Sequence, residues 1–99
     1  MLYAIICEDV PDSLPLRATA RPAHLARLQE MAAANRIALC GPLPAIDSNE
    51  PGEAGFTGSL IVAEFDTLEE AQTWAQQDAY VEAGVFRSVV VKPFKQVLP

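Results

Sequence analysis

The sequence Leu-Tyr-Ala-Ile-Ile-Cys at residues 2–7 decides the fold class, because it is almost wholly apolar and stops at Glu-Asp-Val-Pro in residues 8–11. A short apolar run that ends in turn-forming residues is typical of a buried strand. Three later segments of similar character are also predicted to be strands, at residues 37–40, 57–65 and 86–92.

Two segments between these strands have helical periodicity instead. In residues 21–36 the apolar side chains recur at helical spacing, at Leu25, Leu28, Met31 and Ala32. Pro22 suits the first turn of that helix. Residues 67–77 form the second predicted helix, in which Thr67 and Glu70 have the spacing of a capping box.

The predicted order is therefore strand, helix, strand, strand, helix, strand. This order is typical of a ferredoxin-like α+β domain, βαββαβ, in which a four-stranded antiparallel sheet carries both helices on one face. With 99 residues, the chain is expected to form one domain. A connection rich in Pro, Asp, Ser and Gly spans residues 42–56, and long connections of this kind often carry function.

The strands also predict a partner. The strand at residues 2–7 is apolar on both faces, and the strand at residues 86–92 repeats this pattern. Two helices can cover only one face of a sheet, so the second face needs other cover. We therefore expect a homodimer that packs through the open sheet face and closes into an α+β barrel.

Composition excludes several classes of partner. The net charge is −6 and the seven Lys and Arg residues are scattered, which argues against binding to nucleic acid or to an anionic membrane. The first residues have no basic segment or long apolar run, so a cytoplasmic protein is expected. Cys7 and Cys40 lie in apolar segments without metal-binding spacing, and both are predicted to be buried free thiols.

His24 and Asp78 are the candidate catalytic residues. His24 and Arg21 fall on the apolar stripe of the first helix, and Asp78 falls on the stripe of the second. Because the two helices run antiparallel, the start of one and the end of the other meet at the same edge of the sheet. A carboxylate bonded to one imidazole nitrogen leaves the other free for acid/base chemistry. The alternatives are a histidine that bonds a backbone carbonyl and an aspartate that caps local amides.

Four further residues are candidate ligand contacts near this edge. Arg21 either binds an anionic group or pairs with an acid. Ser59 is interpreted as a hydroxyl that lines the pocket, because no nucleophile-elbow sequence surrounds it. Gly41, before the long connection, and Asp47, within it, complete the set, although Asp47 is first a turn residue.

Arg17 is predicted to lie solvated in a loop. No metal site is expected, since the chain has one histidine and no carboxylate cluster.

The chain resembles the YciI-like (YCII-related) family over essentially its whole length. The resemblance is carried by five segments, Arg-Pro-Ala-His-Leu-Ala-Arg-Leu at 21–28, Gly-Pro-Leu-Pro-Ala-Ile-Asp-Ser-Asn at 41–49, Ala-Gly-Phe-Thr-Gly-Ser at 54–59, Asp-Ala-Tyr-Val-Glu-Ala-Gly-Val-Phe at 78–86 and Val-Lys-Pro-Phe-Lys at 91–95. It implies a ferredoxin-like dimeric α+β barrel and an active site built on a His-Asp dyad at His24 and Asp78. One departure is Ala79, where the family commonly has proline between the aspartate and a tyrosine.

The family also implies a class of chemistry. One relative resembles a dehydrochlorinase of chlorinated hydroxyhydroquinones, and muconolactone isomerases share the barrel architecture. We therefore expect a lyase or isomerase that uses no cofactor and acts on a small cyclic or phenolic compound. The alternative is a non-catalytic dimeric module that binds a metabolite or a protein partner.

Overall fold

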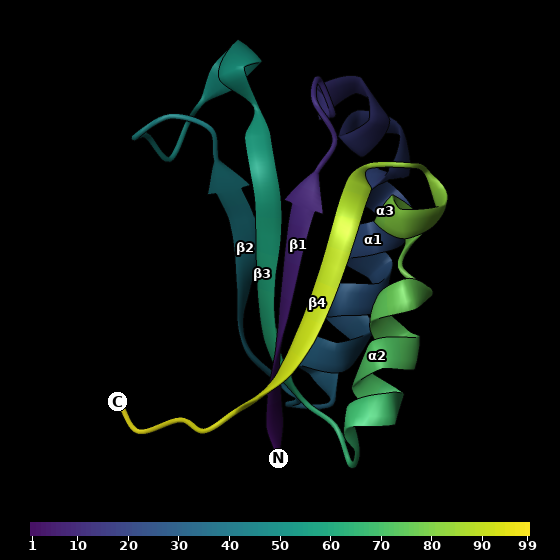
Figure 1. The fold of residues 1–99 in the computed structure, drawn as a ribbon, viewed down its shortest axis with the longest axis vertical. Helices are drawn as coiled ribbons and strands as arrows, with labels where there is room; N and C mark the ends of the chain where they lie inside the picture. Colours follow the sequence, from purple (N-terminus) through teal and green to yellow (C-terminus); the bar gives the residue numbers. More distant parts are fainter.

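Four antiparallel strands form one sheet in the computed structural model, which describes residues 1–99 (Figure 1). The strands are β1 (Leu2–Asp9), β2 (Ile37–Pro44), β3 (Phe56–Glu64) and β4 (Phe86–Phe94). Their order across the sheet is β2-β3-β1-β4, so β1 is central and pairs with both β3 and β4. The predicted α+β class and the ferredoxin-like order of elements are confirmed.

Both long helices cover the same face of this sheet (Figure 1). They are α1 (Leu14–Ala33) and α2 (Leu68–Gln76), and a single turn, α3 (Ala79–Glu82), follows α2. The Thr67 hydroxyl accepts the backbone N–H of Glu70 at 3.1 Å and so caps α2, as the spacing predicted. No helix combines the length and the apolar character that a bilayer span needs.

The predicted start of the first helix is wrong. Helix α1 begins at Leu14, seven residues before Arg21, with Ser13 as its N-cap. Pro15 is the proline of the first turn, whereas Pro22 lies inside the helix. A proline removes one backbone donor, but α1 continues through Pro22 to Ala33. Arg17 consequently lies in a helix and is only 6% exposed, not solvated in a loop.

Helix α1 ends three residues earlier than predicted, because Asn35 adopts a left-handed conformation with φ of 57°. The N–H of Asn35 donates to Ala32 O at 3.0 Å, and the N–H of Arg36 donates to Met31 O at 3.0 Å. This pair of bonds is a Schellman motif, which satisfies the last carbonyls of the helix.

Strand β2 runs to Pro44, past the predicted end at Cys40. The strand continues because residues beyond Cys40 still pair with β3; Gly41, for example, lies opposite Leu60. Because β2 is an edge strand, Cys40 is exposed, and the prediction that both thiols are buried is wrong for this one. Cys7, in the central strand, is buried as predicted.

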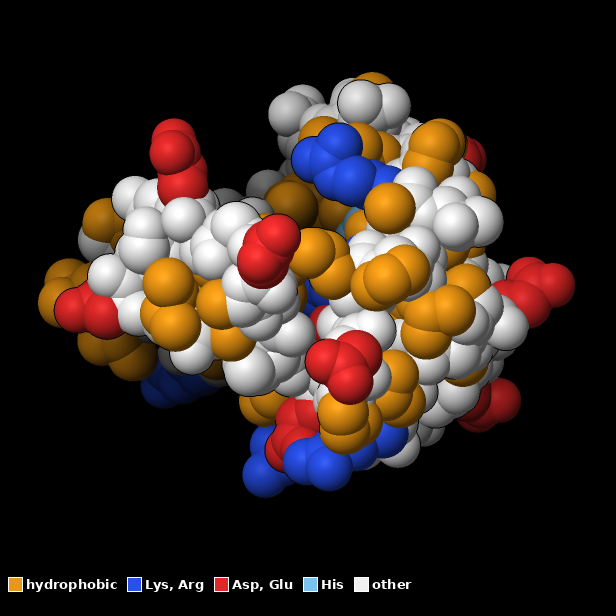
Figure 2. All heavy atoms as spheres, turned by 90° about the horizontal axis from the view of Figure 1, so that it is seen from above, with side chains coloured by type: hydrophobic (Ala, Val, Ile, Leu, Met, Phe, Trp, Pro, Cys, Tyr) orange, Lys and Arg blue, Asp and Glu red, His pale blue; other side chains and the backbone are white.

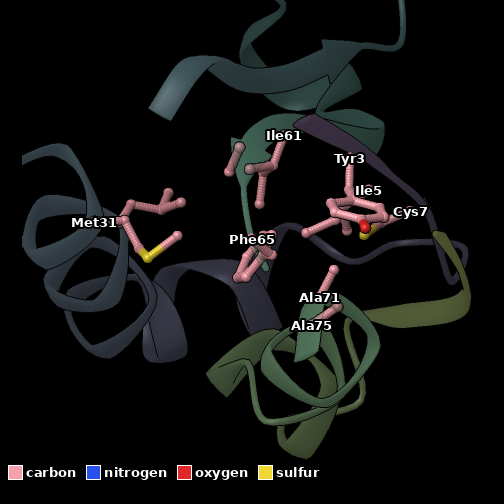
Figure 3. Close-up of a cluster of buried hydrophobic side chains, with 10 residues drawn as sticks. Tyr3, Ile5, Cys7, Met31, Ile61, Phe65, Ala71 and Ala75 are labelled. Atoms are coloured by element: carbon pink, nitrogen blue, oxygen red, sulfur yellow. The ribbon is translucent and has the colours of Figure 1, made fainter. Parts of the chain in front are cut away.

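The core lies between the sheet and both long helices (Figure 3). Phe65 and Ile5 are 2% and 1% exposed, and Tyr3 meets the edge of Phe65 with ring centroids 6.3 Å apart. Ala71 and Ala75 face these rings from α2, and their small side chains let the helix lie close to the sheet. Close packing of this kind holds α2, and the residues that follow it, in a fixed position.

The opposite face of the sheet is apolar but uncovered within the chain. Ile6 of β1 lies opposite Val90 of β4, and they are 39% and 43% exposed. Leu39, Leu43 and Phe94 are also among the exposed large apolar residues of the strands. An uncovered apolar face of this extent is typical of an interaction surface.

Candidate active site

A cavity of about 190 Å³ opens between α1 and the β2–β3 edge of the sheet. Seen from above the strand ends, the molecule is hollowed beside the β2–β3 connection, with basic side chains at the upper rim of the hollow and acidic side chains at its lower rim (Figure 2). The polar side chains that line the cavity are those of Arg17, Arg21, His24, Ser59 and Tyr80. An apolar cavity of roughly 150 Å³ holds benzene, so this volume suits a molecule with a single ring.

His24 and Asp78 lie in direct contact beside this cavity. His24 Nδ1 is 2.8 Å from Asp78 Oδ1, and the two residues are 6% and 3% exposed. The prediction that antiparallel helices bring these residues to one edge of the sheet is therefore confirmed.

Asp78 is held by backbone geometry as well as by His24. Helix α2 ends at Gln76, and Asp78 is the N-cap of the short helix α3. Its Oδ1 accepts the N–H of Tyr80 at 2.9 Å together with the bond to His24. The two interpretations of Asp78, as local cap and as histidine partner, are thus both correct.

The charge state of Asp78 fixes the histidine tautomer. Burial raises the pKa of Asp78, but hydrogen bonds from His24 and Tyr80 and the charges of His24 and Arg27 hold the pKa below its usual value. An ionised carboxylate can only accept, so Nδ1 of His24 carries the shared proton. Nε2 makes no hydrogen bond within the chain, and His24 lines the cavity. In the neutral ring Nε2 is therefore a free base.

Arg27 is a neighbour of the His24–Asp78 pair that the sequence analysis did not identify. Its Nη1 donates to Asp78 Oδ2 at 3.3 Å and its Nη2 donates to Trp74 O at 2.7 Å. The guanidinium also lies over the Trp74 ring, 4.4 Å from the centroid. Arg27 lies three positions after His24, and this helical spacing was the available signal.

Tyr80 was also missed. Its ring stacks on the imidazole of His24, with centroids 3.9 Å apart and an interplanar angle of 10°. Burial raises the pKa of the Tyr80 hydroxyl, and the charges of Arg17 and Arg21 oppose that rise without cancelling it. The phenol is therefore neutral at physiological pH.

Arg17 forms a buried ion pair with Asp9. Its Nε and Nη2 donate to the two carboxylate oxygens at 2.7 Å and 3.0 Å, and Nη2 also donates to Gly58 O at 2.8 Å. The side chains of Arg17 and Asp9 are 8% and 1% exposed. Placing the helix start at Ser13 would have put Arg17 on the same helical face as His24.

The predicted ligand contacts differ in their placement. Arg21 lines the cavity at its exposed side and makes no ion pair with any acid of the chain. Ser59 is buried on β3 and lines the cavity, as does Gly41 of β2. Asp47 is exposed in the β2–β3 connection and does not reach the cavity.

Comparisons with known proteins agree with this fold. The sequence profile of the YCII-related domain matches residues 1–95. Protein YciI of Escherichia coli O6:H1 is 58% identical over 97 residues, covering 98% of this chain and 99% of that protein. A protein of Haemophilus influenzae is 53% identical with the same coverage of each chain.

A solved structure extends the comparison to an enzyme. It is 5-chloro-2-hydroxyhydroquinone dehydrochlorinase (TftG) from Burkholderia phenoliruptrix AC1100 in complex with 2,5-dihydroxybenzoquinone. It superposes with a TM-score of 0.84 and 29% sequence identity, covering 96% of this chain and 94% of that chain.

Proposed function

The chain belongs to the YCII-related family, and from this premise we propose that it is a small enzyme without a cofactor, in which His24 exchanges a proton with a bound substrate. The observation that carries the proposal is the orientation of the imidazole. Asp78 holds Nδ1 at 2.8 Å, and Nε2 is left without a partner in a side chain that lines the cavity. A base fixed in one tautomer beside a ligand-sized space is suited to general acid/base catalysis.

The proposed substrate is a small cyclic or phenolic compound with an anionic oxygen. The cavity suits a single ring, and Arg21 contributes a positive charge that no acid of the chain neutralises. The structural neighbour TftG supports this class, since its complex contains a small quinone. Ser59 and Gly41 would contact the ring from β3 and β2.

The proposed reaction is an elimination or an isomerisation. Nε2 of His24 removes a proton from the substrate, and the electrons of the broken bond enter the conjugated ring. In an elimination a leaving group then departs with its bonding pair. In an isomerisation the imidazolium returns the proton to a different atom. Asp78 stabilises the imidazolium in both cases, and Tyr80 keeps its plane fixed.

The test is turnover by a His24→Gln variant. Wild-type protein is supplied with 5-chloro-2-hydroxyhydroquinone and with a panel of phenols and cyclic lactones, and release of chloride or a change in absorbance is followed. We expect the variant to lose roughly 10²–10⁴-fold in rate on any compound that is turned over. An Arg87→Gln variant, changed at an exposed position outside the cavity, should retain the wild-type rate. Equal rates for wild type and His24→Gln would refute the proposal.

We further propose that the protein acts as a homodimer joined through the open sheet face. The uncovered apolar residues of this face, such as Ile6 and Val90, support that arrangement. The cavity lies on the helix-bearing face, so this dimer would leave it accessible.

A further inference from the structure

We infer that Arg17 is the group that binds the anionic oxygen of the ligand, through its Nη1 nitrogen in the His24 cavity. The inference deepens the proposed function and rests on it for the identity of this cavity as a substrate site. It assigns a specific ligand-binding role to a residue whose ion pair with Asp9 would otherwise be only structural.

The guanidinium of Arg17 is fixed on most of its sides. Asp9 binds Nε and Nη2, Gly58 O binds Nη2 again, and the Ser13 hydroxyl donates to the same Asp9 carboxylate. Aromatic rings also surround it, with Cζ 5.1 Å from the ring centroids of both Phe56 and Tyr80. A side chain held in this way loses little conformational entropy when a ligand binds.

The remaining terminal nitrogen of the Arg17 guanidinium, Nη1, is not engaged by Asp9 or Gly58. Nη1 is bound neither by Asp9 nor by a backbone carbonyl, although the side chain is only 8% exposed. The guanidinium also lies beside the Tyr80 hydroxyl, where a side-chain hydrogen bond from Arg17 acts to lower the pKa of that phenol. No fully buried side-chain nitrogen or oxygen of the chain lacks a partner, so Nη1 retains access to the cavity that Arg17 lines.

The electrostatics of the cavity favour an anion there. Asp9 balances the charge of Arg17, and Asp78 balances that of Arg27 while the His24 ring is neutral. Arg21 lines the same cavity without any acidic partner. The cavity is therefore electropositive in a chain of net charge −6, and a phenolate, enolate or carboxylate fits it.

The position of Tyr80 links this anchor to the proposed base. Its ring contacts the imidazole of His24 on one side and the guanidinium of Arg17 on another. Arg17 and His24 are seven residues apart on α1, which is two helical turns, so both face the cavity. A ring bound between them has its anionic oxygen at Arg17 and its exchanging proton near His24.

The experiment compares two variants that break the same ion pair but change the charge of the cavity in opposite directions. Arg17→Gln removes the anchor, whereas Asp9→Asn leaves Arg17 without its counter-charge. The probe is benzoate, and benzamide is its neutral control. Binding is measured as protection of Cys40, which lines the cavity, from alkylation by iodoacetamide.

We expect wild-type Cys40 to be protected at about tenfold lower concentrations of benzoate than of benzamide. Arg17→Gln should bind benzoate about tenfold more weakly and benzamide unchanged. Asp9→Asn should bind benzoate at least as tightly as wild type. Equal weakening in both variants would mean a structural role only, and equal protection by benzoate and benzamide in wild type would also overturn the inference.

Two further results distinguish the loss of the anion site from a loss of folding and from a failure of the proposed function. If circular dichroism shows that Arg17→Gln is unfolded, the double variant Asp9→Asn with Arg17→Gln replaces both charges by neutral groups of similar shape. It should lose the preference for benzoate, and a retained preference would refute the inference. Arg17-dependent binding in a protein that turns over no compound would refute the proposed function and leave the anion site standing.

Discussion

The imidazole of His24 lies almost parallel to the ring of Tyr80, with centroids 3.9 Å apart and planes 10° apart. Tyr80 follows Asp78 by two residues, and its N–H bonds the same carboxylate oxygen that accepts from His24. One short turn of chain therefore supplies both the hydrogen-bond partner of the imidazole and the surface against which it packs. This arrangement restricts the rotation of His24 about both of its side-chain bonds.

The first prediction concerns this stacked pair. His24 is the one histidine of the chain, so its ring protons give an unambiguous NMR signal. Tyr80→Phe keeps the stack, and we expect it to keep the ring-current shift of the wild-type signal. Tyr80→Leu removes the aromatic ring, so the stack and the ring-current shift should both be lost. This variant should also be less stable by about 2–4 kcal/mol, because Tyr80 is buried. An unchanged His24 signal in Tyr80→Leu would contradict the geometry.

Asp78 should make stability depend on pH in the acid range. Its pKa is lowered in the folded state, so its contribution to the free energy of unfolding is present above the unfolded value of about 3.9 and is lost as pH falls through the folded value. Asp78→Asn should be less stable than wild type by about 1–3 kcal/mol at neutral pH. The difference should shrink as the pH falls below about 4.

Urea unfolding across this pH range measures the effect of Asp78. Asp66→Asn, which changes an exposed acid that forms no ion pair, serves as the control and should show no such convergence. A difference between wild type and Asp78→Asn that stays constant down to about pH 3 would contradict the prediction.

Gly58 of β3 should be far less tolerant of a side chain than Gly41 of the neighbouring strand β2. A Cβ at Gly58 would come within 2.1 Å of the Cys7 carbonyl oxygen, whereas a Cβ at Gly41 would have no neighbour within 4 Å. We expect Gly58→Ala to cost about 1–3 kcal/mol or more, and Gly41→Ala about 0.5 kcal/mol or less. Thermal unfolding of the two variants checks this, and similar losses in both would count against the strand register.

The two cysteines should differ sharply in reactivity. Burial raises the pKa of the Cys7 thiol to about 12, with help from the negative charges of Asp78 and Asp9, and Cys40 is exposed. Iodoacetamide should therefore modify Cys40 in the folded protein and leave Cys7 intact. Peptide mass spectrometry identifies the site, and Cys40→Ser should abolish fast labelling. Rapid labelling of Cys7 in folded Cys40→Ser would show that the central strand opens readily.

The proposed dimer makes a prediction for the open sheet face. Val90→Asp places a charge at a 43% exposed position on this face, and we expect it to convert a dimer into a monomer. Leu68→Asp is the matched control, because Leu68 is 36% exposed in the first turn of α2. It should leave the dimer intact. Analytical ultracentrifugation at micromolar concentration distinguishes these results, and a monomeric wild type would end the dimer proposal.

The failures of the sequence analysis have identifiable physical causes. Pro22 was predicted to lie in the first turn of the helix, whereas Pro15 occupies that turn in the structure, and either proline is compatible with a helix start. The choice of Pro22 removed Arg17 from the helix and so hid its pair with Asp9. Cys40 was predicted to be buried because local apolarity does not reveal that a strand lies at the edge of the sheet.

Local periodicity and the antiparallel course of two helices were sufficient to predict the order of the elements and the meeting of His24 with Asp78. The further groups that surround this pair could be identified only from the folded chain. Arg27, Tyr80 and Nη1 of Arg17 take their places through distances between separate elements. Periodicity shows which side of a helix a residue faces, but the packing of the whole chain sets those distances.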